Sequence, residues 1–210
     1  MRAPGPEIFL PLVGLVGRAY FGVRFEGVEN IPLEGPLIIA PNHVTYVDPP
    51  LVAFPARRPI YFMAWKRLFD VPLFGRLIRF LRAFPLETDS ADPTAVRGAA
   101  RLLRAGQAVM IFPEGGRTLD GCLQRFKPGA FRLACSQGAA ILPVTIVGAH
   151  ESWPPQRVLP RPGRITIVYH PPVKPAPGVP PRVAAPDLAH QVRAVIASRL
   201  PPHQRPVEDD

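Results

Sequence analysis

Short apolar runs alternate along this chain with segments in which apolar residues recur at helical spacing. Apolar runs bounded by Gly, Pro and polar residues predict strands. The expected strands lie at residues 23–27, 37–40, 59–64, 107–112, 139–147 and 164–169. The expected helices lie at residues 49–56, 71–82, 92–105, 128–137 and 184–200. Because strands alternate with helices, we expect a single α/β domain with a central mixed or largely parallel sheet flanked by helices.

The pattern over residues 71–82 predicts an amphipathic helix. The apolar residues expected along one side of it are Val71, Phe74, Leu77, Ile78 and Leu81. Cations and aromatic side chains are interleaved in and before this helix, a mixture typical of a lipid headgroup boundary. The alternative is a solvated helix face over an ordinary core. The cations are Arg57, Arg58, Lys66, Arg67, Arg76, Arg79 and Arg82, and the aromatics are Phe62, Trp65, Phe69, Phe74 and Phe80.

The expected divisions of the chain are an apolar N-terminal segment (1–24), a folded domain (25–200) and a tail (201–210) that frays from His203. The N-terminal apolar run, residues 8–17, is too short to span a bilayer. Only Arg2 precedes it and no clear small-residue cleavage site follows, which argues against a signal peptide. We expect an interfacial, membrane-associating segment, with a buried core helix as the alternative.

The composition describes a folded, basic protein. Hydrophobic residues make up 47% of its 210 residues, which excludes a disordered chain. Lys and Arg number 25 against 16 Asp and Glu, so an anionic partner is expected: nucleic acid, a phosphorylated substrate or an anionic membrane. Part of the Arg and Pro excess reflects compositional bias. Cys122 and Cys135 have neither metal-ligand spacing nor the number for a disulfide framework, and both suit a reducing cytoplasm.

A histidine and an aspartate follow the expected strand at 37–40. His43 and Asp48 are separated by four residues, which on a continuous helix would point them roughly 140° apart. Pro49 disfavours helix at the residue before it, so the segment can curl and Asp48 can bond the ring from just outside a helix that starts at Pro49. This pair has the composition of a general base with its orienter. The alternative is that Asp48 only caps the helix and His43 is an ordinary loop residue.

A glycine-rich turn follows the expected strand at 107–112. Gly115 and Gly116 let backbone N–H groups approach an anion, and the Arg117 guanidinium can fork onto it. Lys127 adds a second cation beside a helix start. Both this turn and His43 follow strands, where ligands bind in open α/β sheets. The alternative is a tight turn in which Glu114 and Arg117 pair with each other.

Four motifs in order resemble those of the glycerolipid acyltransferase family of the lysophosphatidic acid acyltransferase type. The resemblance covers roughly residues 25–170. The matching segments are Asn42-His43 with Asp48 (N-H-x4-D), Phe112-Pro113-Glu114-Gly115-Gly116-Arg117 (F-P-E-G-x-R), Phe126-Lys127-Pro128-Gly129 (F-K-x-G) and the apolar strand Leu142-Pro143-Val144-Thr145-Ile146.

One further family motif matches only in part. Lys66, Pro72 and Gly75 fit it, but Thr88 stands where an Arg is expected after Glu87. A phosphate contact of the family is therefore absent or supplied by another cation. Arg82, six residues earlier, is our expected substitute, and an ordinary exposed helix arginine is the alternative.

The resemblance implies transfer of a fatty acyl group from acyl-CoA or acyl carrier protein to a lysophospholipid hydroxyl, with 1-acylglycerol-3-phosphate as the expected acceptor. It implies His43 as general base and Asp48 as its orienter, with no metal and no cofactor beyond the acyl donor. Binding of the acceptor would fall to Glu114, Gly115, Gly116, Arg117, Lys127, Lys66 and Arg82. The enzyme would work at the cytoplasmic membrane face, where the basic surface docks.

Two other interpretations remain open at this point. The acceptor could be another lyso-lipid, including one without a phosphate, for which Thr88 is less anomalous. The protein could also be a non-catalytic basic module that binds membranes or nucleic acid. Against nucleic acid, the basic cluster lacks a recognisable reading motif, so we expect no such partner.

Overall fold

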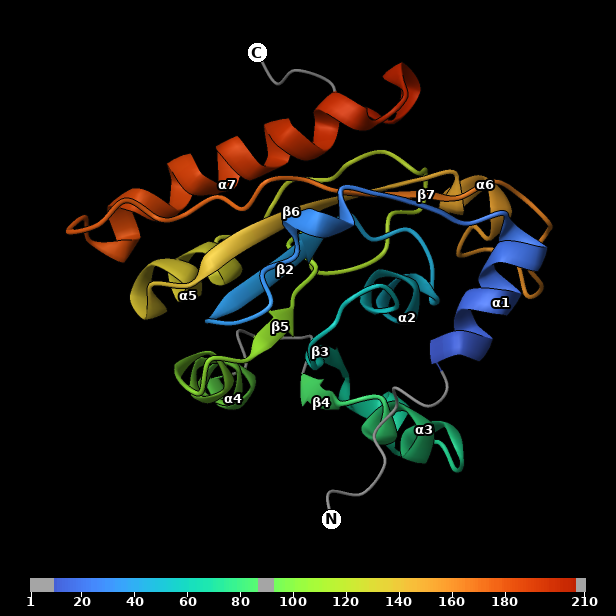
Figure 1. Cartoon of the computed structure of the whole chain (residues 1–210), viewed down its shortest axis with the longest axis horizontal. Coiled ribbons are helices and arrows are strands. Elements are labelled where there is room, and N and C mark those ends of the chain that lie inside the picture. The colour runs from blue at the N-terminus through green and yellow to red at the C-terminus, as the bar shows by residue number, and fades with distance from the viewer. Residues whose placement is uncertain (1–9, 87–92, 207–210) are drawn as a thin grey trace.

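The computed structural model describes residues 10–86 and 93–206. Its centre is a seven-stranded sheet in the order β1-β7-β6-β2-β5-β3-β4 (Figure 1). Five neighbouring strands, from β6 to β4, are parallel, whereas β7 is antiparallel to β6 and β1 is parallel to β7. The expectation of a largely parallel sheet is therefore confirmed. The strands are β1 (Arg24–Glu26), β2 (Leu37–Pro41), β3 (Ile60–Trp65), β4 (Ala83–Leu86), β5 (Ala108–Met110), β6 (Ala140–Val147) and β7 (Thr166–Tyr169).

Helices cover both faces of this sheet. One face packs against α2 and the end of α1, and the other packs against α4, α5 and α7 (Figure 1). The α-helices are α1 (Leu10–Phe21), α2 (Asp48–Ala53), α3 (Phe74–Phe80), α4 (Pro93–Arg104), α5 (Gly129–Gln137), α6 (Ala149–Ser152) and α7 (Pro181–Arg199). The short 3₁₀ helices are η2 (Val28–Asn30), η3 (Lys66–Phe69) and η4 (Pro202–Gln204).

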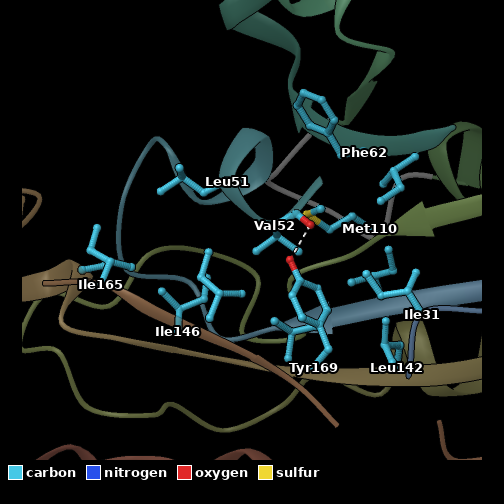
Figure 2. Close-up of a cluster of buried hydrophobic side chains, with 14 of the residues drawn as sticks. Ile31, Leu51, Val52, Phe62, Met110, Leu142, Ile146, Ile165 and Tyr169 are labelled. Carbon is cyan, nitrogen blue, oxygen red and sulfur yellow. Dashed lines mark hydrogen bonds between the residues drawn. The ribbon is translucent and has the colours of Figure 1, made fainter. Parts of the chain in front are cut away.

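The apolar run at 37–40 has no polar alternation because β2 is buried on both sides. Leu37 and Ile39 belong to the core under α2, while Ile38 and Ala40 belong to the core under α4, α5 and α7. Strands covered on both faces read as continuous apolar runs for this reason. On the α2 side, the Tyr169 hydroxyl donates a 2.8 Å hydrogen bond to the Val52 carbonyl, so a buried tyrosine ties the sheet to α2 (Figure 2).

The helix predicted over residues 71–82 is shorter and is rotated, so that only part of its predicted apolar side faces the core. It spans only Phe74–Phe80, and Val71, Phe74 and Leu77 are exposed while Ile78 is buried. The cause is Gly75, which packs so closely on η3 that an added Cβ would lie 2.2 Å from the Phe69 carbonyl oxygen. The glycine face of the helix is turned inward, so its large apolar side chains are left outside.

The membrane-associating role of the N-terminal segment stays a prediction, whereas one expectation for the C-terminal tail is contradicted. In the N-terminal helix α1, Gly14 and Gly17 are buried, and Gly17 faces Leu51 of α2, whereas Leu15 is 65% exposed. The expected fraying from His203 is wrong for residues up to 206, because Gln204 is buried and its carbonyl accepts a hydrogen bond from the Leu123 N–H. Among the described residues, every helix is too short or too polar to cross a bilayer.

Candidate active site

Two loops meet where β2 and β5 end side by side. β2 and β5 are paired in parallel, so both carboxyl ends lie at one edge of the sheet. The histidine loop, residues 42–48, leaves β2, and the glycine loop, residues 113–118, follows β5 closely. The two sequence-predicted motifs therefore share one edge, as ligand sites do in open α/β sheets.

The histidine loop is anchored by Asn42. Its side-chain amide donates to the Ile146 carbonyl at 3.0 Å, and its side-chain oxygen accepts from the Ile146 N–H at 2.7 Å. Because it both donates to and accepts from one residue of β6, the buried Asn42 side chain pairs with β6 as a strand residue would. The sequence motif includes this asparagine, but its role as an anchor depends on a partner that the motif does not contain.

His43 and Asp48 are in contact. His43 Nδ1 lies 2.9 Å from Asp48 Oδ2, and Asp48 is 0% exposed. The Val44 and Thr45 N–H groups each donate to the same oxygen at 2.8 Å, and the Thr45 hydroxyl donates to Oδ1. Because both carboxylate oxygens already act as acceptors, Nδ1 is the donor toward Asp48, and the lone pair of the neutral ring is on Nε2. The imidazole is thus fixed in one tautomer.

The alternative in which Asp48 only caps a helix is wrong. Helix α2 begins at Asp48 itself, one residue earlier than expected, and its next two residues are Pro49 and Pro50. Neither proline has an N–H to be capped, and the Leu51 N–H donates to the Val47 carbonyl. The carboxylate therefore turns back toward residues 43–45 instead of forward into the helix.

Glu114 joins the two loops. One of its oxygens accepts from the His43 N–H at 2.7 Å, and the other accepts from the Gln124 N–H at 2.8 Å. The Thr118 N–H in turn donates to the His43 carbonyl at 2.9 Å. Burial raises the pKa of Glu114 to about 7, against the lowering effect of these two N–H donors. The alternative in which Glu114 pairs with Arg117 is therefore wrong, since both of its oxygens serve the backbone.

Aromatic rings contact the side chains of His43 and Arg117. The His43 ring stacks on Phe112, with ring centroids 3.8 Å apart. The Arg117 guanidinium carbon lies 3.5 Å from the centre of the Tyr46 ring, a close cation–π contact. Arg117 Nη1 is buried and has no hydrogen-bond partner among the described residues. A buried guanidinium N–H without an acceptor favours an anion at this position.

Lys127 lies against the glycine loop. Gly115 has φ +78°, a conformation that favours glycine, and a Cβ added to it would lie 2.5 Å from Lys127 Nζ and displace the ammonium group. The Lys127 N–H also donates to the Pro113 carbonyl at 2.8 Å. The structure therefore gathers Gly115, Lys127 and the neighbouring Arg117 at the end of β5, as the sequence predicts.

Lys66 and Arg82 lie further along the same edge. In the strand register Ala83 pairs with Phe62 and Phe62 with Met110, so Arg82 is level with the end of β5 but two strands away. Two strand spacings amount to roughly 10 Å. Lys66 directly follows β3. Thr88 lies outside the described residues, so the substitution of Arg82 for the missing arginine stays a prediction.

Three partners in this site were missed by the sequence reasoning. Thr45 bonds Asp48, Tyr46 stacks on Arg117, and Gln124 bonds Glu114. Thr45 and Tyr46 lie inside the N-H-x4-D motif, where a hydroxyl three residues before an aspartate is a readable signal. The contact between Tyr46 and Arg117 joins distant parts of the chain and has no local signal.

This combination of fold and loops matches a known class of proteins. The family model described as Acyltransferase matches residues 22–147, and the chain belongs to this family. The chain is 31% identical over 188 residues to a 1-acyl-sn-glycerol-3-phosphate acyltransferase of Chlamydomonas reinhardtii, covering 87% of this chain and 54% of that one. It is 28% identical over 161 residues to a chloroplastic enzyme of the same name from Arabidopsis thaliana, covering 73% and 44%.

A solved structure shows the same fold. The 1-acyl-sn-glycerophosphate (LPA) acyltransferase PlsC of Thermotoga maritima superimposes with a TM-score of 0.76 and 29% identity, over 90% of this chain and 74% of that chain. The chain spans about half the length of the curated relatives named above. The resemblance to lysophosphatidic acid acyltransferases expected from the motifs is confirmed.

Proposed function

We propose that this protein transfers a fatty acyl group from a thioester, acyl-CoA or acyl carrier protein, to the free hydroxyl of a lysophospholipid. The proposed acceptor is 1-acylglycerol-3-phosphate, which would give phosphatidic acid. The observation that carries the proposal is the direct link between the two loops. The backbone of His43 bonds Glu114 and Thr118 on either side of Arg117, so a fixed imidazole and an open guanidinium serve one site. The names of the relatives support the same chemistry.

In the proposed reaction, His43 Nε2 takes the proton of the acceptor hydroxyl while its oxygen attacks the thioester carbonyl. The tetrahedral intermediate collapses, the C–S bond breaks, and the imidazolium returns the proton to the leaving thiolate. Asp48 stabilises the imidazolium and keeps Nδ1 protonated throughout. The acyl group passes directly to the acceptor, and the sequence has no nucleophile elbow that would form an acyl-enzyme.

The acceptor phosphate would bind at the glycine loop. Arg117 Nη1 would donate the hydrogen bond that it does not make to any described residue, and the Lys127 ammonium group beside Gly115 would add a second positive charge. Tyr46 would keep the guanidinium in place before the phosphate arrives. Glu114 would hold this loop at a fixed distance from His43. The site of action proposed is the cytoplasmic face of the cell membrane, reached without a spanning helix in the described residues.

Release of free thiol tests the proposal. Purified protein and an acyl-CoA are mixed in three separate reactions, each with one acceptor. The acceptors are 1-acylglycerol-3-phosphate, a lyso-lipid with a blocked phosphate, and monoacylglycerol. The proposal expects thiol release that depends on the acceptor and is fastest with 1-acylglycerol-3-phosphate. Equal or faster release with monoacylglycerol would favour the second candidate, an acceptor with little or no phosphate, for which Thr88 is the supporting observation. A non-catalytic membrane module would release no thiol with any acceptor.

A further inference from the structure

An apolar and basic surface lies on the segment between β3 and β4. We define this docking face as Trp65, Arg67, Val71, Leu73, Phe74, Arg76 and Leu77, all exposed. Leu73 is 76% exposed and Leu77 is 51% exposed, on a seven-residue helix. The segment from 65 to 80 carries Lys66, Arg67, Arg76 and Arg79 against the single acid Asp70. Large apolar side chains and cations therefore share one exposed surface.

The backbone holds this surface outward at some cost. Leu73 has φ 63° and ψ −51°, and the Phe74 N–H donates to the Pro72 carbonyl at 2.7 Å. This is a γ-turn with positive φ, a rare conformation that costs a non-glycine residue of order 1–3 kcal/mol. The turn places the most exposed leucine of the segment at its tip. Gly75 then fixes α3 on η3 so that Phe74 and Leu77 stay outside.

The docking face lies at the sheet edge that carries the candidate active site. Phe62 pairs with the last residue of β5, and β3 continues for three more residues to Trp65, roughly 10 Å past that end. Helix α1 lies at the same edge, because β1 runs opposite to the five parallel strands and α1 ends just before it. Figure 1 shows α1, α2 and α3 gathered at this side of the sheet.

We propose that the docking face inserts its apolar side chains into the headgroup layer of an anionic bilayer. Lipid is favoured as the partner because cations lie among the exposed apolar side chains and would complement the charge of anionic headgroups. Arg67 precedes the exposed leucines and Arg76 lies between them; both are exposed and would meet lipid phosphates while Leu73 and Leu77 reach the acyl boundary. Arg58 is not part of this lipid contact, because its guanidinium donates hydrogen bonds to the carbonyls of Pro32, Gly35 and Gly106.

This inference deepens the proposed function, because a lysophospholipid acceptor would then reach His43 directly from the bilayer. Its test, however, reads membrane binding and not turnover. If the protein binds vesicles through the docking face and releases no thiol, the inference stands while the proposed function fails. If thiol is released from dispersed substrate but the docking face does not touch lipid, the opposite holds.

The first experiment measures co-sedimentation of the full chain with phosphatidylcholine vesicles that contain or lack phosphatidylglycerol. The triple variant Leu73→Ser/Phe74→Ser/Leu77→Ser is expected to bind anionic vesicles on the order of 100-fold more weakly. The double variant Arg67→Gln/Arg76→Gln is expected to lose about fivefold in affinity for each cation, and only with anionic vesicles. The control Leu33→Ser/Val183→Ser removes two apolar side chains outside the docking face that are about as exposed as Leu73 and Leu77. This control should bind vesicles like wild type.

Two results would overturn the inference. One is a folded triple variant that binds anionic vesicles like wild type. The other is a wild type that self-associates through this face, so that the triple variant becomes monomeric without any change in vesicle binding. That outcome would assign the face to a second copy of the chain.

The second experiment needs no change in the docking face. Trp65 and Trp153 are the two tryptophans of the chain, so Trp153→Phe leaves Trp65 as the only reporter. Lipids brominated near the top of the acyl chain should quench Trp65 fluorescence when the protein binds anionic vesicles. Vesicle binding with unquenched Trp65 would place the membrane contact elsewhere, for instance at α1, and would contradict the inference.

Discussion

The histidine loop and the glycine loop lie side by side, yet they differ in how completely their key polar atoms are hydrogen-bonded. Every acceptor of Asp48 is used within the loop, by two N–H groups, a hydroxyl and the His43 ring. In the glycine loop, Arg117 rests on an aromatic ring and keeps a buried N–H without an acceptor among the described residues. Under the proposed function, the loop that holds the base has its polar atoms satisfied, whereas the loop that binds the acceptor phosphate keeps a donor oriented but open.

Asp48→Asn should weaken the satisfied loop and have the largest effect among the loop substitutions that leave the His43 ring in place. An amide that keeps its oxygen at the Oδ2 position places its NH2 group against the Thr45 hydroxyl, and all four hydrogen bonds lose their charged acceptor. We expect a loss of about 2–4 kcal/mol in the free energy of unfolding and a fall in kcat of about 10²–10⁴-fold, because the ring loses its fixed tautomer. Urea unfolding and thiol release measure the two effects.

The matched control is Thr45→Val, which removes only the hydroxyl bond to Asp48 Oδ1 and should cost about 1 kcal/mol of stability. If Asp48→Asn is no more disruptive than Thr45→Val, the backbone N–H groups do not depend on the carboxylate in the way described.

Glu114 links the two loops, and its titration should appear as a pH dependence of stability. Its pKa is about 7 in the folded protein, above the ordinary 4.5, so the native state holds the proton to higher pH than the unfolded state. The stability contributed by this group is complete below about pH 4.5 and is lost as pH rises through about 7. Between pH 5 and pH 8, wild type should lose roughly 2–4 kcal/mol relative to Glu114→Gln, which does not titrate. Parallel pH profiles in urea unfolding would contradict this.

Arg117→Ala should act on the open loop. It removes a charge-assisted contact to the acceptor phosphate, worth roughly 1.5–3 kcal/mol, or about 10- to 150-fold in kcat/KM. We expect a higher KM for the acceptor and an unchanged KM for the acyl donor. Arg125→Ala, a neighbouring exposed arginine, is the control and should have no effect. A rise in the donor KM instead would mean that the glycine loop binds the thioester carrier.

Tyr46→Leu should give the smallest effect, because it removes the ring under Arg117 and leaves the charge. A cation–π contact of this kind is worth roughly 0.5–2 kcal/mol, so the acceptor KM should rise by about 2- to 30-fold. Tyr46→Phe keeps the ring and should behave like wild type. Tyr46→Leu made in the Arg117→Ala background should not change the acceptor KM any further. Additive effects of the two substitutions would show that Tyr46 does not act through Arg117.

Much of this architecture could be predicted from local pattern. The strands at 37–40 and 139–147 are readable because burial on both faces leaves an unbroken apolar run. The His43–Asp48 contact is confirmed, but the expected effect of Pro49 is wrong, because Asp48 is the first residue of α2 and does not lie outside the helix. The capping alternative could not be rejected from sequence, because the Leu51 N–H was still free to be capped; the structure shows that it donates to the Val47 carbonyl.

The features that the sequence did not predict depend on contacts between segments. Helical periodicity grouped Phe74, Leu77 and Ile78 on one side. It could not show that the close fit of Gly75 on the Phe69 backbone rotates the helix, so that Ile78 stays buried while Phe74 and Leu77 are exposed. Likewise, nothing near Arg117 in the sequence announces that its guanidinium lies on Tyr46. Such contacts depend on how distant segments meet, which composition and spacing do not encode.

The central claim is that His43 acts as the base for a hydroxyl whose phosphate is held separately. The most direct test is thiol release by His43→Ala with acyl-CoA and 1-acylglycerol-3-phosphate, combined with calorimetric binding of the lyso-lipid to the same variant. General-base catalysis contributes roughly 10²–10⁴-fold, so turnover should fall by that factor while lyso-lipid affinity stays within about twofold of wild type, because Arg117 and Lys127 are untouched. A folded variant that keeps most of its turnover would contradict the assignment of His43 as the base.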